Sequence, residues 1–428
     1  MFGFANFLLL ALFAAAVFDL IFALARGGGL RGALHGLWNT PHLLFGQQLA
    51  EWRLQLGRIL FAAGLAAYEI SVVFCNSMAR QNWAWVQGVM SPVLEWLAFL
   101  CFGAKILFGT RYTWRELLAG GALYFIARWV YFNSQNIWWI GIVVAVLAAK
   151  DVPLRRPLQV YFASGCAAMA VVLALHFAGI VAPDLTSERM GALRGTYGYG
   201  HPNTFGGLVF GLVLAYALLR AQKVRWVDCL LVFAVGVFLL VGPASRSAAL
   251  CTLALAVGVF CRLRAGHSVP RWWPGTCAGM VGLTAAVSYL LPLLVIKVGP
   301  WNNDIGPAWL AKLDSLLTCR ISLTWMAYRL LDVKIAGQVF NWPTVDNSFA
   351  FALFQFGPVV AALLGILFAA ALWGHAKQGR QVEVCCLFAM LAYAYMEVQP
   401  FHLTTNPTAL LLCGAVFAQT SARWQKIE

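Results

Sequence analysis

Charged residues are scarce in this chain. They make up 11% of its 428 residues, against about 25% in an ordinary globular domain. Hydrophobic residues make up 61% of the chain, and the mean hydropathy is +0.76. So few charges cannot cover the surface of a soluble globular protein, and the composition therefore indicates a membrane protein.

Sequence patterns for metal, nucleotide and disulfide sites are also missing. The chain has no HExxH, no CxxC, no Asp-x-Asp of the kind that holds a cation in nucleotide-sugar transferases, and no Walker or Rossmann loop. Its eleven cysteines show no framework spacing, and only Cys319 lies in a long predicted loop, so we expect buried thiols. The sequence predicts neither a metal nor a cofactor.

Apolar runs recur along the whole chain. About 20 residues are needed to cross a hydrocarbon layer of about 30 Å. The first run lacks a basic n-region and a cleavage site, so we assign it as a membrane helix and not as a signal peptide. We expect an all-α polytopic protein with about 12–13 spans in one integral membrane domain, 1–428. The spans are placed near 2–25, 58–76, 90–109, 116–133, 137–149, 158–182, 204–220, 227–242, 247–261, 275–297, 347–373, 383–399 and 407–420.

Basic residues recur in alternate loops, and this pattern assigns those loops to the cytoplasm. The net charge of +14 follows from this sorting and does not indicate a nucleic-acid surface. The side of the N-terminus is left open. A large external loop, 298–346, carries an amphipathic helix over 306–332 that we expect to lie along the membrane as a lid. The other external segments are 183–203, 243–246 and 400–406.

Three arginines fall on the external side, against the sorting rule: Arg194, Arg246 and Arg320. The guanidinium fork matches phosphate oxygens, and three converging forks would hold a diphosphate. Headgroup contact or snorkelling at a helix end is the alternative for each. Arg246 is the strongest candidate, because Gly242-Pro243 breaks the helix just before it, at membrane depth.

The external stretch RGTYGYGHPNTFGG, residues 194–207, supplies further candidates. A helix is expected to begin near Thr204, with Asn203 as its N-cap. His201 either acts as a base, hydrogen-bonds a sugar hydroxyl, or is a surface residue without a role. Tyr199 is included as a substrate-binding candidate.

Two more polar groups border spans. The run Asp346-Asn347-Ser348 is first of all a helix start, although a carboxylate facing external arginines is also suited to a general base. Glu397, in EVQPFHLTTNP, ends a span and is either a substrate-binding residue or an interfacial one.

The order of these motifs resembles the O-antigen ligase and polymerase superfamily. Arg-Gly at 194–195, GHPNTFGG at 200–207, SRSA at 245–248, CRISLTW at 319–325 and VDNSF at 345–349 carry the resemblance. More closely, the chain looks like the Wzy-type polymerases that extend capsular, exopolysaccharide or O-antigen chains. The motifs cover roughly 190–360, and each is short and degenerate, so their order and common side carry the match.

The resemblance implies a GT-C-like fold and a metal-independent glycosyltransferase in the bacterial cytoplasmic membrane, with an outward-facing active site. Donor and acceptor would be polyprenyl diphosphate-linked oligosaccharides, and a chain-length regulator is a candidate partner. The implied catalytic residues are His201, Asp346 and Arg246. The implied substrate-binding residues are Arg194, Arg320, Asn203, Asn347, Tyr199 and Glu397.

Other functions remain open at this point. The ligase branch of the superfamily transfers a finished glycan to a lipid or protein acceptor, but it uses a histidine in the long loop, and 298–346 contains none. The general base is thus either His201 or Asp346. A transporter would predict internal repeats and charges near the bilayer midplane, and an envelope assembly factor would predict that the external arginines tolerate alanine.

Overall fold

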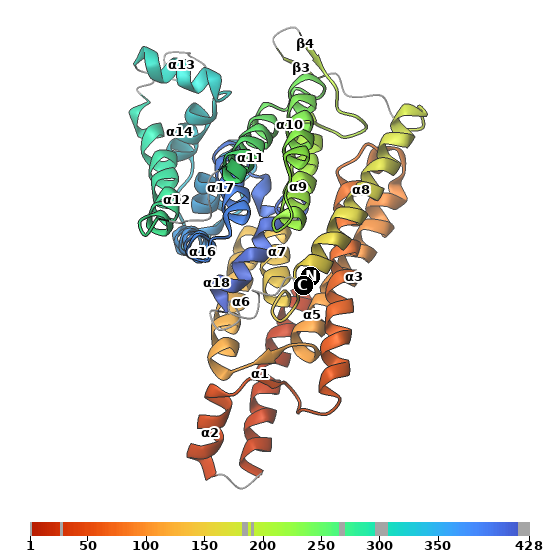
Figure 1. Cartoon of the computed structure of the whole chain (residues 1–428), viewed down its shortest axis with the longest axis vertical. Coiled ribbons are helices and arrows are strands. Elements are labelled where there is room, and N and C mark those ends of the chain that lie inside the picture. Colours follow the sequence, from red (N-terminus) through yellow and green to blue (C-terminus); the bar gives the residue numbers. More distant parts are fainter. Residues whose placement is uncertain are drawn as a thin grey trace. The chain divides into compact units, whose positions relative to one another are not determined.

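The computed structural model describes residues 2–25, 29–181, 187–189, 192–264, 270–295 and 307–417 (Figure 1). Most residues of this part of the chain are helical. Its strands form two short antiparallel pairs, β1 (His42–Leu43) with β2 (Arg111–Tyr112), and β3 (Ser187–Arg189) with β4 (Ala192–Arg194). The all-α prediction is confirmed.

The chain divides into two compact units. Unit 1 comprises Met1–Arg128, Trp139–Thr204 and Ala409–Glu428, and unit 2 comprises Trp129–Trp138 and Phe205–Thr408. The four boundaries fall within α6 (Trp114–Ser134), α7 (Ile137–Ala148), α9 (Pro202–Arg220) and a 3-10 turn at Pro407–Leu412.

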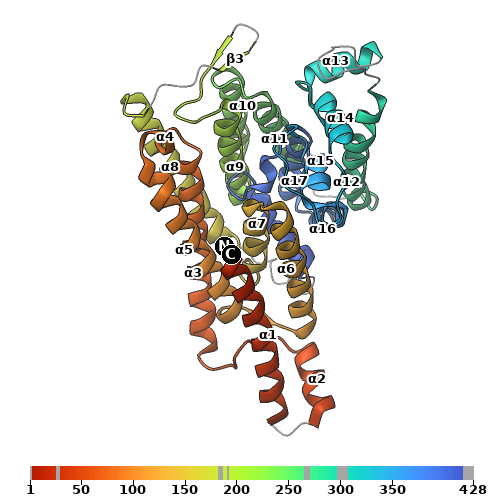
Figure 2. The same ribbon diagram turned by 180° about the vertical axis from the view of Figure 1, so that it is seen from behind.

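Unit 1 is built around α3 (Ala50–Cys75), which packs against α5 (Ser91–Phe108) and α8 (Arg155–Phe177); the three run side by side in both views (Figure 2). A Cβ added at Gly57 would lie 2.8 Å from Gly109 Cα. Glycine therefore lets α3 touch the end of α5 directly. The other helical elements of this unit are α1 (Phe2–Ala25), α2 (Gly29–Asn39), α4 (Ala79–Asn82), a π-turn (Val86–Met90), α7 (Ile137–Ala148) and α18 (Cys413–Val416).

Unit 2 is built around α11 (Arg246–Arg264), which packs against α10 (Trp226–Val241) and α17 (Gln381–Met396). A second pair, α12 (Trp273–Leu290) and α16 (Pro358–Lys377), packs together in the same unit. Shorter elements are α13 (Ala308–Leu316), α14 (Arg320–Leu330), α15 (Ser348–Phe351), a π-turn (Ala352–Phe356) and 3-10 turns at Leu291–Leu294, Gln399–Phe401 and Pro407–Leu412, the last one reaching into unit 1.

The chain is a multi-pass membrane protein by the length and composition of its helices. Among the described residues, 8 helices are long and apolar enough to cross a membrane. Further predicted spans correspond to shorter apolar helices, Ile137–Ala148, Trp226–Val241 and Gln381–Met396. All eleven cysteines are free thiols, but the prediction that they are buried is confirmed only in part: six are buried, whereas Cys75, Cys166 and Cys385 are half-buried and Cys261 and Cys319 are exposed.

The predicted span 347–373 is wrong, because the chain is interrupted within it. Gly357 has φ 86° and Pro358 starts the next helix. A Cβ at Gly357 would lie 2.1 Å from Ile335 O, so the backbone of a preceding loop occupies the space that a side chain would need. Proline suits the first helical position because it has no amide to leave unpaired.

The single amphipathic helix predicted over 306–332 is also wrong. The structure has two helices there, α13 and α14, separated at Thr318 and Cys319, which both have φ 62°. The buried Asp314 carboxylate holds this corner, because it accepts the backbone amide of Ile321 at 2.7 Å. Arg320 is thus the first residue of a helix, not a mid-helix residue.

The span predicted at 407–420 is shorter than expected. A 3-10 turn over Pro407–Leu412 continues into α18, and together they form a short apolar helix, Pro407–Val416. The residues after 417 lie outside the described part of the chain.

Candidate functional site

Polar side chains of unit 2 gather where α11 begins and α17 ends. These two helices run antiparallel: near their other ends Gly258 faces Cys385, and Arg264 ends α11. Ser247 and Glu397 therefore lie at the end of unit 2 opposite to its basic residues Arg264 and Arg380, as the charge pattern predicts.

Glu397 connects several segments at this end. Its carboxylate Oε1 accepts hydrogen bonds from Ser247 Oγ at 2.5 Å and from the Arg320 guanidinium at 2.5 Å. Its backbone carbonyl accepts a third, from Ser348 Oγ at 2.6 Å. Burial raises the pKa of Glu397, while Arg320 and Ser247 oppose that shift. One residue thus joins the starts of α11, α14 and α15 to the end of α17.

Arg320 is buried and held on several sides. Its Nε donates to Met396 O, its Nη1 to Leu317 O at 2.9 Å, and its Nη2 to Glu397. The side chain is 9% exposed. Three of the five guanidinium N–H groups are therefore used within the protein, and the burial of the side chain limits the access of a phosphate to the other two.

Arg246 presents the opposite environment. It is exposed, it is the first residue of α11, and its side chain makes no hydrogen bond or ion pair with a described residue. Of the two predicted arginines in unit 2, Arg246 is the exposed one and Arg320 is buried.

Asn347 and Asp346 lie at the start of α15. Asn347 Oδ1 accepts the amides of Phe349 at 2.9 Å and Ala350 at 3.1 Å, so the predicted helix start is confirmed. Its Nδ2 donates to Ser288 Oγ and to Tyr395 O. Asp346 is half-buried, interacts electrostatically with Glu397, and forms no hydrogen bond with a described residue. Its carboxylate is suited to accept a proton from a ligand.

The remaining predicted residues lie in unit 1. Helix α9 begins at Pro202, so the prediction that Asn203 caps a helix starting near Thr204 is wrong. The cap is His201, whose ring Nδ1 accepts the Asn203 amide at 3.1 Å. A neutral histidine that accepts through Nδ1 carries its proton on Nε2, which makes the exposed side of this ring a donor and not a base.

Asn203 instead binds Arg194. The guanidinium of Arg194, which is buried, donates to Asn203 Oδ1 at 2.8 Å. Tyr199 is buried too, and its backbone pairs with Ser77 just after the end of α3. Because α3 has 26 residues and is therefore about 39 Å long, this group is far from the basic loops of unit 1, where Arg53 donates to Phe108 O.

The glycines of the TFGG motif allow close packing in unit 2. A Cβ added at Gly206 would lie 2.2 Å from Ser245 Oγ and 2.5 Å from Ser245 Cβ. One added at Gly207 would lie 1.8 Å from Gln399 Oε1. The motif thus brings α9 against the turn that precedes Arg246, a role that sequence reasoning did not assign to it.

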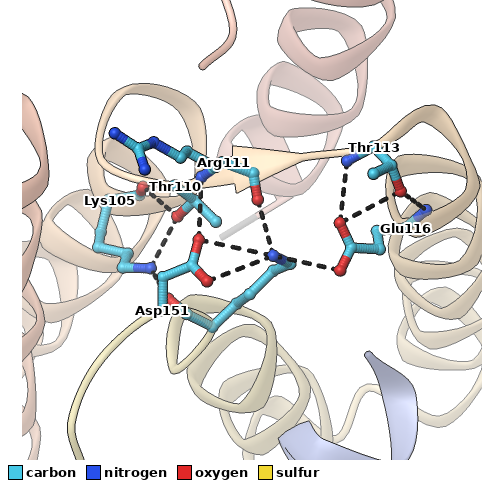
Figure 3. A network of polar contacts seen from close by, with 7 residues as sticks. Lys105, Thr110, Arg111, Thr113, Glu116 and Asp151 are labelled. Atoms are coloured by element: carbon cyan, nitrogen blue, oxygen red, sulfur yellow. Dashed lines mark hydrogen bonds and ion pairs between the residues drawn. The ribbon is translucent and has the colours of Figure 1, made fainter. Parts of the chain in front are cut away.

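A buried polar network, which the sequence analysis also missed, lies at the basic end of unit 1 (Figure 3). Lys105 donates to Thr110 Oγ1 at 2.7 Å, and Thr113 donates its amide to Glu116 at 2.9 Å. Lys150 lies 3.3 Å from Glu116 and 3.5 Å from Asp151. The Lys150 ammonium lies between the two carboxylates and also donates to Arg111 O at 2.7 Å, so the network ties these loops together.

Two other ionisable groups are relevant to the alternatives. Glu69 is buried within α3 and makes no hydrogen bond or ion pair with a described residue; a lone glutamate in the apolar run LAAYEISVVF was the available sequence signal. His402 stacks on Trp138 at a centroid distance of 3.8 Å, and burial lowers its pKa to about 3. His402 is therefore a poor base at neutral pH.

No metal centre is evident in the described ranges, where no group of three or more His, Cys, Asp or Glu side chains could hold an ion.

Comparison of the chain with family models, with curated proteins and with solved structures finds no match. The assignment of a function therefore depends on the site itself and on the motif order.

Proposed function

We propose that this protein is a membrane glycosyltransferase that polymerises polyprenyl diphosphate-linked oligosaccharide repeat units at the outer face of the bacterial cytoplasmic membrane. The product would be a capsule, exopolysaccharide or O-antigen chain, and the fold would be of the GT-C type. One observation carries the proposal: Arg246 is exposed beside the buried Ser247–Glu397–Arg320 cluster, at the end of unit 2 opposite to Arg264 and Arg380.

The reaction needs one anion site and one proton acceptor. A sugar hydroxyl of the acceptor attacks the anomeric carbon of the donor, and the bond from that carbon to the diphosphate oxygen breaks. The bonding electrons leave with the polyprenyl diphosphate, so negative charge develops on the leaving oxygen. An arginine fork stabilises such charge, and the exposed Arg246 has no described partner that would compete for it.

The hydroxyl proton needs an acceptor in the same step. Asp346 is half-buried and forms no hydrogen bond with a described residue, whereas the Nδ1 of His201 is already used as a helix cap. We therefore assign the base to Asp346 and a capping role to His201. Neither a metal nor a nucleotide is required, since the energy for transfer is carried by the diphosphate linkage of the donor.

The test is a gene disruption followed by complementation. Lipid-linked and surface glycans are separated on a gel from cells that carry the wild-type gene, no gene, Arg246→Ala or Arg264→Ala. Arg264 ends the same helix, is also exposed, and serves as the matched control. We expect single repeat units without the gene and with Arg246→Ala, and a normal ladder with Arg264→Ala.

The other outcomes distinguish the alternatives. Full-length polymer that stays on the polyprenyl carrier in the disrupted strain would identify a ligase. Repeat units trapped at the inner leaflet would identify a transporter. A normal ladder with Arg246→Ala, at unchanged protein level, would remove Arg246 from the reaction.

A further inference from the structure

The residue that follows Arg246 is anchored to the other side of unit 2. Ser247 is 6% exposed, and its hydroxyl donates to Glu397 Oε1 at 2.5 Å, across 150 positions of sequence. Adjacent Cα atoms are 3.8 Å apart. A bond that fixes Ser247 therefore also fixes the backbone from which the Arg246 side chain extends.

Glu397 is itself held from three directions. Arg320 donates to the same carboxylate oxygen, Ser348 donates to the Glu397 carbonyl at 2.6 Å, and the Glu397 amide donates to Tyr393 O at 2.8 Å. The anchor of Ser247 is therefore rigid, which is what a positioning group requires.

The two arginines of this end have different surroundings. Arg320 uses Nε, Nη1 and Nη2 on Met396, Leu317 and Glu397. Arg246 is exposed and has no described partner. Arg320 therefore stabilises the structure of the site, whereas Arg246 can contact an anion.

We propose that Ser247, Glu397 and Arg320 are positioning residues that hold Arg246 in place for the leaving diphosphate, and that Arg320 does not contact the substrate. The inference rests on the proposed function and replaces the expectation that Arg320 and Glu397 bind substrate directly. It also assigns a role to Ser247, which motif reasoning treated only as part of SRSA.

A positioning role predicts a specific kinetic pattern. Ser247→Ala removes the anchor but keeps Arg246, so substrate still binds while the fork no longer meets the developing charge. A misplacement of about 1 Å costs on the order of 100-fold in rate. We expect kcat for chain elongation to fall roughly 10- to 100-fold with little change in KM, and Ser247→Thr, which keeps a hydroxyl, to recover most of it.

The deciding experiment is a double-mutant cycle with purified protein in lipid vesicles. Elongation is measured with lipid-linked repeat units extracted from the disrupted strain, using wild type, Ser247→Ala, Arg246→Lys and the double variant. Lysine lacks the fork, so the precise position of residue 246 matters less in that background. If Ser247 acts through Arg246, Ser247→Ala costs less than about twofold in the Arg246→Lys protein.

A matched control separates this role from general stability. Thr252→Ala removes another buried hydroxyl from α11, one that bonds Ala248 O at 2.7 Å within its own helix. We expect normal kcat for this variant. Equal losses from Ser247→Ala in both backgrounds, or unchanged kcat in Ser247→Ala, would overturn the positioning role while leaving the polymerase intact. Absence of elongation by the wild-type protein would instead count against the proposed function.

Discussion

A methyl group added at Gly206 should disturb the turn that leads into Arg246. The new Cβ would lie 2.2 Å from Ser245 Oγ and 2.5 Å from Ser245 Cβ, where ordinary contacts begin at 3.4 Å. Ser245 is fully buried, so neither the loop nor α9 has free space to move into. Overpacking of this kind costs about 1–3 kcal/mol.

The cost is partly offset, because alanine is favoured over glycine within a helix by about 0.8–1.0 kcal/mol. The clash involves a Cβ atom and not the end of a flexible side chain, so we take the upper end of the overpacking range. The expected net loss of stability for Gly206→Ala is about 2 kcal/mol. In a unit of this size that corresponds to a fall of roughly 4–8 °C in the melting temperature.

The free cysteines of unit 2 supply the assay. Cys251, Cys277 and Cys386 are buried, so a dye that becomes fluorescent on reaction with thiols reports their exposure as the protein is heated in detergent. Cys261 and Cys319 are exposed and would be replaced by serine beforehand to lower the background.

Two further variants make the prediction refutable. Ser245→Gly removes both clashing atoms, so Gly206→Ala combined with Ser245→Gly should melt near the Ser245→Gly protein. Gly365→Ala is the matched control: it lies within α16 with nothing within 4 Å of the added Cβ, and should melt at or above the wild-type temperature. If Gly206→Ala behaves like Gly365→Ala, or if Ser245→Gly does not rescue it, the packing argument is wrong.

Three other predictions are also measured as thermal stability, with the buried thiols Cys101 and Cys413 as reporters for unit 1 and tryptophan fluorescence for the pH series. Lys150→Met leaves Glu116 without its cation, so we expect a loss of about 3–5 kcal/mol, seen as a lower melting temperature; an unchanged temperature would show that the network adds nothing. Glu69→Met replaces a buried carboxyl that has no described hydrogen-bond partner, and should stabilise the protein by about 1–3 kcal/mol; a loss of stability would reveal a role for Glu69. Burial raises the pKa of Glu397 in the folded protein. The protonated side chain therefore contributes fully to the free energy of unfolding below the unfolded-state pKa of about 4.3, and this contribution is lost as the pH rises through the folded-state pKa. The wild-type protein should therefore lose stability relative to Glu397→Gln as the pH rises above about 4, and a difference that does not change with pH would contradict this sign.

Local patterns predicted the helical fold well. The apolar runs located α1, α3, α5, α8, α9, α11 and α12 because burial in lipid requires about 20 apolar residues in a row, a property that can be read from neighbouring residues alone. Breaks were harder to place. Gly357 interrupts a continuous apolar run because the backbone of Ile335 occupies the space beside it, and that contact cannot be read from residues 347–373.

The candidate site divides in the same way. Charge sorting singled out Arg246, Arg320 and Glu397, because a charged group at the end of a span is unusual wherever its partners lie. The sequence did not show that Arg320 is paired whereas Arg246 is exposed. It also placed the cap of α9 at Asn203, whereas His201 makes that bond.

The amino-acid sequence by itself determined that this protein is an all-α, multi-pass membrane protein, and which polar residues border its spans. Hydropathy and charge are properties of single residues, and the positions of apolar and charged residues along the chain are enough to locate the spans and the polar residues that border them. Only the tertiary structure decided which of those residues meet. Ser247, Arg320 and Glu397 come from three distant segments, and a hydrogen bond forms only at about 3 Å, a distance that the packing of α11, α14 and α17 sets.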